Sequence, residues 1–130
     1  MRLLLLSCQV FEGEIGRLLP ECPHAVEVEF LDKDLHVRGG APMRDAIQAR
    51  IDERDDGGYD AVLLGFGLCN RGLAGLRARR APLVAARAHD CIAIFMGGRE
   101  AYQRRFDEKP GTYYLTSGWV RFGQTSTLNA

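Results

Sequence analysis

The sequence predicts an α/β protein of the flavodoxin-like or Rossmann-like class, a three-layer sandwich around a mainly parallel sheet of about five strands. Short apolar or alternating runs recur along the chain, segments of helical spacing separate them, and Gly or Pro residues mark many of the joins. Strands that alternate with helices in this way form parallel sheets, because each crossover returns the chain to the same end of the sheet.

Five segments are predicted to be strands. Residues 2–8 contain the run LLLL, which is too short for a secretory signal or a membrane span and suits a strand buried on both faces. The segment HAVEVEFLD alternates apolar and polar residues, which indicates a strand with one solvated face near a sheet edge. The remaining strands are YDAVLLGFG, LVAARAHD and GTYYLTSGW, the last rich in aromatic and β-branched residues.

Helices are predicted between these strands. One covers residues 14–19 and stops at Pro20. A second begins near Pro42, has apolar residues at helical spacing and ends at Gly57. A short helix is expected around residues 73–78, and one or two more lie in CIAIFMGGREAYQRRF.

Length and charge limit the function classes. The 130 residues predict one α/β domain spanning 1–130, and 17 basic residues balance 17 acidic ones. No net field would then recruit nucleic acid or an anionic membrane, so we expect neither as a partner. We expect a cytoplasmic protein, in which four cysteines indicate metal binding or reactivity more than disulfides.

Three of the cysteines occupy equivalent places in the predicted sheet. Cys8, Cys69 and Cys91 each come at or just past the carboxyl end of a strand, and these ends share one edge of a parallel sheet. They are too far apart in sequence for a local zinc motif, so the fold would have to assemble any shared site. Cysteine is also a common inert core residue, which is the alternative for each one alone. Cys22, between two prolines, is taken to be incidental.

Polar residues accompany the cysteines at this edge. His89 could be a fourth metal ligand, a proton donor or a half-buried structural imidazole. Asp90 fits the cap of the following helix better than a base, and we keep it with His89 as a catalytic candidate. That helix terminus and Arg87 would favour the thiolate of Cys91, and Arg71 could clamp an anionic substrate. Thr116 and Ser117 are expected to line a substrate pocket.

Several segments together resemble the DUF1638 family of uncharacterised prokaryotic proteins. They are LDKDLH, YDAVLLGFGLCNRG, RAHDCIAIFMGGREAYQRRF and PGTYYLTSGW, and the resemblance runs from Cys8 to Trp119. It implies that the motif cysteines are Cys8, Cys69 and Cys91, with His89 beside the last. Relatives usually continue well past the GW segment, so a C-terminal portion is expected to be missing from this domain. The resemblance also hints at corrinoid-dependent methyl-transfer systems, and it supplies no reaction.

Three thiolates favour a soft metal centre. A [4Fe-4S] cluster held by three cysteines would keep one iron open, and we expect Lewis-acid or sulfur-transfer chemistry on a small anionic substrate, as in a lyase or sulfur transferase. Zinc bound with His89 is an alternative cofactor. Two other classes remain open: a metal-free enzyme with Cys91 as nucleophile and His89 as base, and a non-catalytic module that binds a small ligand. A homodimer also remains open.

Overall fold

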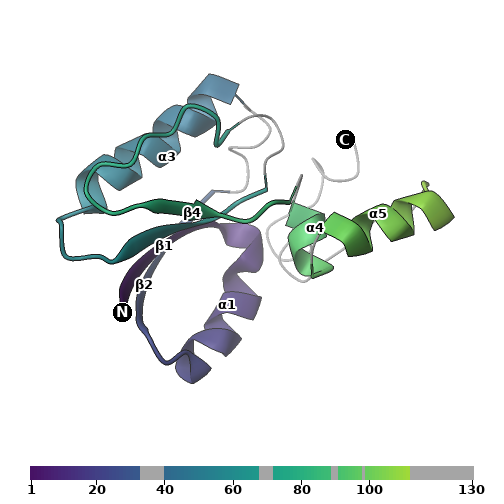
Figure 1. The fold of residues 1–130 in the computed structure, drawn as a ribbon, viewed down its shortest axis with the longest axis horizontal. Helices are drawn as coiled ribbons and strands as arrows, with labels where there is room; N and C mark the ends of the chain where they lie inside the picture. Colours follow the sequence, from purple (N-terminus) through teal and green to yellow (C-terminus); the bar gives the residue numbers. More distant parts are fainter. Residues whose placement is uncertain (33–39, 68–71, 89–90, 98, 112–130) are drawn as a thin grey trace.

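The computed structural model of the chain describes residues 1–32, 40–67, 72–88, 91–97 and 99–111. Within them lie four strands, all parallel: β1 (Arg2–Cys8), β2 (Ala25–Leu31), β3 (Ala61–Gly65) and β4 (Leu83–Ala85). Their order in the sheet is β2-β1-β3-β4 (Figure 1). This is the order of the first four strands of a flavodoxin-like sheet, so the predicted fold class is confirmed. The fifth predicted strand falls almost entirely outside the described residues.

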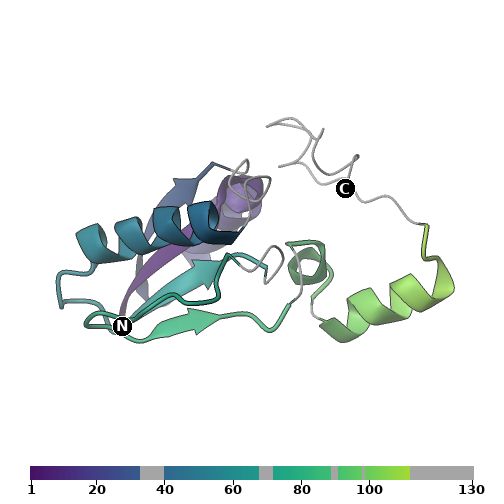
Figure 2. The ribbon, with the colours of Figure 1, turned by 90° about the horizontal axis from the view of Figure 1, so that it is seen from above.

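Helices lie on both sides of the sheet. The short helices η1 (Gln9–Phe11) and η2 (Leu19–Glu21) flank α1 (Glu12–Leu18). On the opposite face lies α3 (Gly40–Arg54), which gives the three predicted layers (Figure 1). The last helices, α4 (Cys91–Phe95) and α5 (Arg99–Glu108), lie beyond the carboxyl ends of the strands and over neither face (Figures 1 and 2).

The face of the sheet under α3 holds the best-buried part of the core. Arg50 of α3 donates a hydrogen bond to Glu29 of β2, at 3.3 Å, which fixes the helix over this face. The side chains that meet here are at most 8% exposed, and they are Leu4, Leu6, Leu31, Val62 and Leu64 from the strands and Met43, Ile47 and Ile51 from α3. Burial of β1 on this face is therefore as predicted.

The prediction of a helix around residues 73–78 is wrong. These residues form a turn and an irregular loop between β3 and β4. Gly75 has φ +86°, a left-handed conformation that interrupts a helix. The side chain of Gln48 also replaces helical hydrogen bonds, since it accepts from the backbone N–H of Arg77 at 2.8 Å and donates to the carbonyl of Arg77 at 3.1 Å. The loop thus lies against α3, held by side-chain contacts that local propensity does not reveal.

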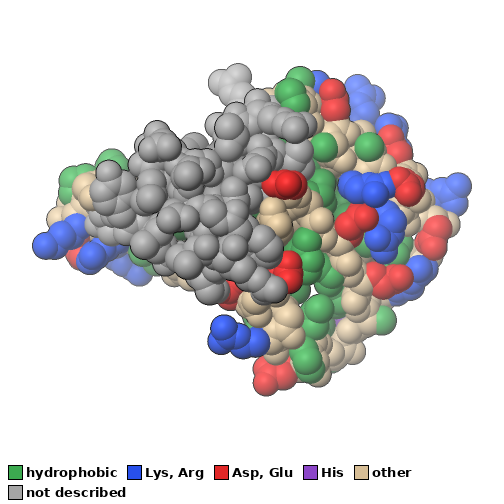
Figure 3. Space-filling view, turned by 180° about the vertical axis from the view of Figure 1, so that it is seen from behind, with side chains coloured by type: hydrophobic (Ala, Val, Ile, Leu, Met, Phe, Trp, Pro, Cys, Tyr) green, Lys and Arg blue, Asp and Glu red, His purple; other side chains and the backbone are tan. Residues whose placement is uncertain are grey.

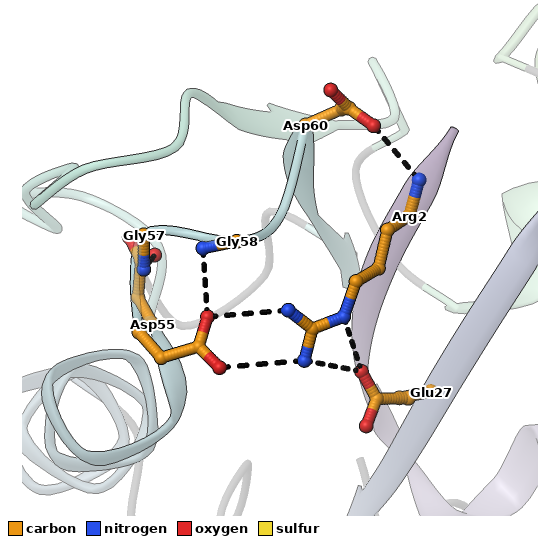
Figure 4. Close-up of polar contacts among 7 residues, drawn as sticks. Arg2, Glu27, Asp55, Gly57, Gly58 and Asp60 are labelled. Carbon is orange, nitrogen blue, oxygen red and sulfur yellow. Dashed lines mark hydrogen bonds and ion pairs between the residues drawn. The ribbon is translucent and has the colours of Figure 1, made fainter.

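Charged groups join the strands at the amino edge of the sheet. The guanidinium of Arg2 donates to Glu27 at 3.1 Å and to both carboxylate oxygens of Asp56 at 3.3 and 3.4 Å (Figure 4). It also lies 4.1 Å from the ring centroid of Tyr59. The backbone N–H of Arg2 donates to Asp60 at 2.8 Å. Side chains of both charges mix at the end of the molecule that carries this edge, on the right of Figure 3.

Asp55 is a buried carboxylate that ties the end of α3 to the start of β4. It is 7% exposed and accepts three backbone hydrogen bonds, from Gly57 at 3.2 Å and from Arg80 and Ala81 at 2.9 Å each. Burial by itself would raise the pKa of Asp55, but the three amides stabilise the charged form and the pKa lies below its ordinary value. Asp55 therefore has a structural role, at the edge opposite the predicted site.

Candidate functional site

Cys8 is held at the carboxyl edge by β1, one of the two inner strands of the described sheet. It is the last residue of β1, which is hydrogen-bonded to β2 on one side and β3 on the other. The Cys8 side chain is 5% exposed and belongs to the main apolar cluster. Its position is as predicted, and its strand can shift little without breaking both ladders.

A buried hydroxyl sits next to Cys8. Ser7 is 0% exposed, and its Oγ lies 3.1 Å from the carbonyl oxygen of Cys8 and 3.3 Å from that of Gly65. Gly65 is the residue paired with Ser7 across β1 and β3, and a Cβ on it would lie 2.5 Å from Ser7 Oγ. The glycine therefore makes room for the hydroxyl, which links the two strand ends from which the chain leaves the sheet.

Cys91 reaches the same apolar cluster from a different part of the chain. It is the first residue of α4, as predicted, and its half-buried side chain packs against the cluster that contains Cys8. One turn later, Phe95 stacks on Phe11, with ring centroids 4.5 Å apart and an interplanar angle of 28°. Phe11 ends the short helix that follows Cys8. This stack fastens the segment after Cys8 to the helix that begins at Cys91.

Only part of the predicted site falls within the described residues. Arg87 does, and its side chain is exposed in the connection between β4 and α4. The other predicted residues lie outside them: Cys69, Arg71, His89, Asp90, Thr116 and Ser117. The structure thus brings Cys8 and Cys91 to one cluster and says nothing of the rest.

Cys22 lies apart from this pair. It follows η2 and precedes β2, so it is near the amino edge of the parallel sheet. Its backbone N–H donates to the carbonyl of Leu19 at 3.1 Å. The expectation that Cys22 is not part of the cysteine site agrees with this position.

Among the described residues, no group of three His, Cys, Asp or Glu side chains could hold a metal ion. Cys8 and Cys91 supply two thiols, and the third predicted ligand, Cys69, is not among the residues searched. The donor chemistry of the pair suits a soft metal, and the number of ligands is a matter for experiment.

Sequence reasoning missed two features of this edge. The Phe11 and Phe95 stack gave no local signal, because the two rings come from segments far apart in sequence. Ser7 did carry one, since a lone hydroxyl directly after four leucines in a buried strand needs a hydrogen-bond acceptor.

The chain was compared with models of known protein families. A family model described as a protein of unknown function, DUF1638, matches residues 30–129. The chain belongs to the DUF1638 family. The resemblance seen in the sequence is thereby confirmed, although the DUF1638 match starts after Cys8 and continues past Trp119. Cys69 and Cys91 lie inside it. No curated protein and no solved structure matched the chain.

The described helices also bear on the membrane question. None of them is both long enough and apolar enough to cross a bilayer.

Proposed function

We propose that this DUF1638 protein binds a metal centre through Cys8, Cys69 and Cys91, in the form of a [4Fe-4S] cluster at the carboxyl edge of the sheet. The observation that carries the proposal is the placement of Cys8 and Cys91. Cys8 ends β1 and Cys91 begins the helix that follows β4, and both side chains belong to or pack on the hydrophobic core. β1 and β4 end at the carboxyl edge of the sheet, where open α/β sheets bind ligands.

The expected path of the chain after β3 supports Cys69 as the third ligand. β3 is the neighbour of β1 and runs parallel to it, so the chain leaves β3 at the same edge as Cys8. Gly67, the last described residue before Cys69, is only two positions away. We therefore expect Cys69 near the end of β3, since consecutive Cα atoms are about 3.8 Å apart.

The surroundings of the thiols fit a soft, poorly solvated centre. Thiolates are preferred ligands of iron-sulfur clusters, and the low exposure of Cys8, at 5%, limits the access of water and oxygen to that thiol. With three protein ligands the cluster would supply an open iron for Lewis-acid or sulfur-transfer chemistry. The exposed guanidinium of Arg87 would attract a small anionic substrate to this edge, and His89 is the proposed proton donor.

Anaerobic purification followed by iron and sulfide analysis tests this proposal. We expect a brown protein with about four iron and four sulfide per chain, as a [4Fe-4S] cluster requires. Cys8→Ser, Cys69→Ser and Cys91→Ser should each lose most of the iron, whereas Cys22→Ser, at the other edge, should keep it. A folded, colourless protein that contains no iron after anaerobic reconstitution would contradict the proposal. One zinc ion bound per chain would instead support the alternative cofactor, zinc.

A metal-free cysteine enzyme is the second candidate, and the difference in exposure between the two thiols favours it. Cys91 is half-buried, whereas Cys8 is 5% exposed, so a reagent or substrate could reach Cys91 more easily. In that enzyme Cys91 attacks as a thiolate and His89 is its base. Alkylation with iodoacetamide followed by mass spectrometry separates the two candidates: fast modification of Cys91 alone in iron-free, active protein supports the enzyme, and equal, slow modification of Cys8 and Cys91 counts against it.

A further inference from the structure

The turn between α3 and β3 contains a chemically reactive peptide bond. Asp56 is followed by Gly57, and no other Asp–Gly or Asn–Gly pair occurs in the sequence. In such a pair the backbone nitrogen of the glycine can attack the aspartate Cγ, because no glycine side chain hinders the approach. The attack expels water and closes a succinimide ring. Water then reopens the ring, and opening at the α-carbonyl leaves isoaspartate, whose main chain runs through the β-carboxyl group.

The Asp56 carboxylate is held in its ionised form in the folded chain. Its Oδ1 accepts a hydrogen bond from the backbone N–H of Gly58 at 2.8 Å, and its two oxygens accept from the guanidinium of Arg2 at 3.3 and 3.4 Å (Figure 4). The amide of Gly58 and the guanidinium of Arg2 lower the pKa of Asp56. An ionised carboxylate is a poor electrophile, because the oxygen that leaves as water must first gain protons.

The peptide group between Asp56 and Gly57 is held from both sides. Arg80 Nη1 donates to the carbonyl oxygen of Asp56 at 3.1 Å, and the N–H of Gly57 donates to Asp55 Oδ1 at 3.2 Å. Asp55 cannot easily follow Gly57 into another conformation, because it also accepts hydrogen bonds from the backbone N–H groups of residues 80 and 81. The nitrogen of Gly57 would therefore have to break its contact with Asp55 before it could react.

We propose that the Asp56–Gly57 bond is the site at which this chain forms isoaspartate, and that Arg2 and Arg80 suppress the reaction in the folded protein. Both arginines come from outside the turn, Arg2 from β1 and Arg80 from the loop before β4. The guanidinium of Arg2 also fills the space beside Gly58, where an added Cβ would collide with it. The protection is therefore a property of the assembled amino edge and is absent from the isolated turn.

Isomerisation would also undo the contacts that suppress it. It inserts the Cβ of Asp56 into the main chain, so Gly57 and Gly58 must shift relative to Asp55 and Arg2. The N–H of Gly57 supplies one of the three backbone hydrogen bonds that Asp55 accepts. Its loss would loosen the connection between the end of α3 and the start of β4. Molecules that carry isoaspartate should therefore unfold at lower urea concentration than unmodified ones.

Peptide mapping with electron-transfer fragmentation, after warm incubation in mildly acidic buffer, measures isoaspartate at position 56. In the folded parent protein we expect it to form severalfold more slowly than in a synthetic peptide of residues 52–61. Arg2→Gln should raise the rate in the folded protein severalfold, because the carboxylate loses its guanidinium partner. Arg79→Gln is the matched control: it removes a similarly exposed ion pair, with Asp52 at 2.6 Å, and should leave the rate unchanged.

Arg80→Gln covers the case in which Arg2→Gln fails to fold. It removes the contact with the carbonyl of Asp56, leaves the carboxylate bonded to Arg2 and should also raise the rate above that of Arg79→Gln. Circular dichroism selects conditions in which the compared proteins are folded. Equal rates in the folded parent protein and the peptide would overturn the proposal. So would Arg2→Gln and Arg80→Gln proteins that form isoaspartate no faster than Arg79→Gln.

Discussion

The ring of Phe11 stacks on the ring of Phe95 with centroids 4.5 Å apart, and this contact joins the ends of two segments that each begin with a cysteine. Cys8 immediately precedes the short helix that ends at Phe11, and Cys91 begins the helix that ends at Phe95. The aromatic pair therefore helps to hold the segment after Cys8 against the helix that begins at Cys91.

Replacing Phe95 by alanine should weaken this connection. We expect Phe95→Ala to lower the free energy of unfolding by about 1–2 kcal/mol, because it removes an aromatic pair and a partly buried ring. Urea denaturation measures the loss. Phe106→Ala on α5 is the control and should change the midpoint little, since that ring is 48% exposed. If Phe95→Ala and Phe106→Ala unfold alike, the stack does not hold α4 to the domain.

Phe95→Ala should also affect the metal if the proposed centre exists. Its iron content after anaerobic purification should fall below that of Phe106→Ala, because Cys91 would lose its fixed position. Full iron content in Phe95→Ala would show that the ligands are held by something other than the aromatic contact.

The buried carboxylate of Asp55 should make the free energy of unfolding depend on pH in the acidic range. Its pKa is lowered in the folded protein, so its contribution is fully present above the ordinary pKa of about 3.9 and is lost as the pH falls below that value toward the folded pKa. We expect Asp55→Asn to lose about 2 kcal/mol near neutral pH, since one oxygen that accepts backbone hydrogen bonds is replaced by a donor. The difference from the parent protein should shrink at pH 3.

Urea midpoints between pH 3 and pH 7 measure this effect. Asp45→Asn is the matched control, because Asp45 lies on α3 with a side chain that is 73% exposed. A gap between Asp55→Asn and the parent protein that stays constant over this pH range would contradict the assigned role of the charge.

The close fit between Gly65 and Ser7 gives a third prediction. Gly65→Ala would place a methyl group 2.5 Å from Ser7 Oγ and 2.8 Å from its Cβ, so the strand ends must separate. A loss of about 1–3 kcal/mol is expected, as in other overpacked cores. Gly16→Ala on α1 meets no atom within 4 Å and should leave stability equal or slightly higher. Thermal unfolding of the two variants compares them, and similar melting temperatures would show that β1 and β3 can move apart freely.

Salt should weaken the contribution of the amino-edge ion pairs to the stability of the fold. Arg2 bridges Glu27 and Asp56 through exposed ion pairs, which salt screens (Figure 4). We expect Arg2→Gln to lower the urea midpoint in dilute buffer and to approach the parent protein in 1 M NaCl. A difference that persists at high salt would instead assign the effect to the contact of Arg2 with the Tyr59 ring.

The sequence predicted the fold class and the edge position of two cysteines because both follow from local pattern. Leucine runs and helical spacing locate strands and helices, and parallel strands must end at one edge. The loop that replaced the expected helix around residues 73–78 was not predictable in this way. Its shape depends on Gln48, which lies far away in sequence. The aromatic stack at the site was missed for the same reason.

The outcome for β1 shows the limit of pattern alone. Four consecutive leucines predicted burial on both faces, and under α3 that is what the structure shows. On the other face Leu3 and Ser7 are also buried, at 7% and 0% exposed, whereas Leu5 is only partly buried, because coverage depends on which segments return to the sheet. Composition describes how apolar a strand is, whereas the number of layers over it is a property of the whole chain.

Cys8 and Cys91 are attached to the domain in different ways, by strand pairing and by helix packing. Cys8 ends a strand that is hydrogen-bonded to neighbours on both sides, whereas Cys91 begins a five-residue helix that is held to the core by side-chain packing, through Cys91, Ile94 and Phe95 among others. In the proposed metal centre the Cys8 sulfur would be held in place by the sheet, whereas the Cys91 sulfur could be repositioned by a small movement of α4. Tolerance of different ion radii or oxidation states would come from the helix, while the sheet stays unchanged.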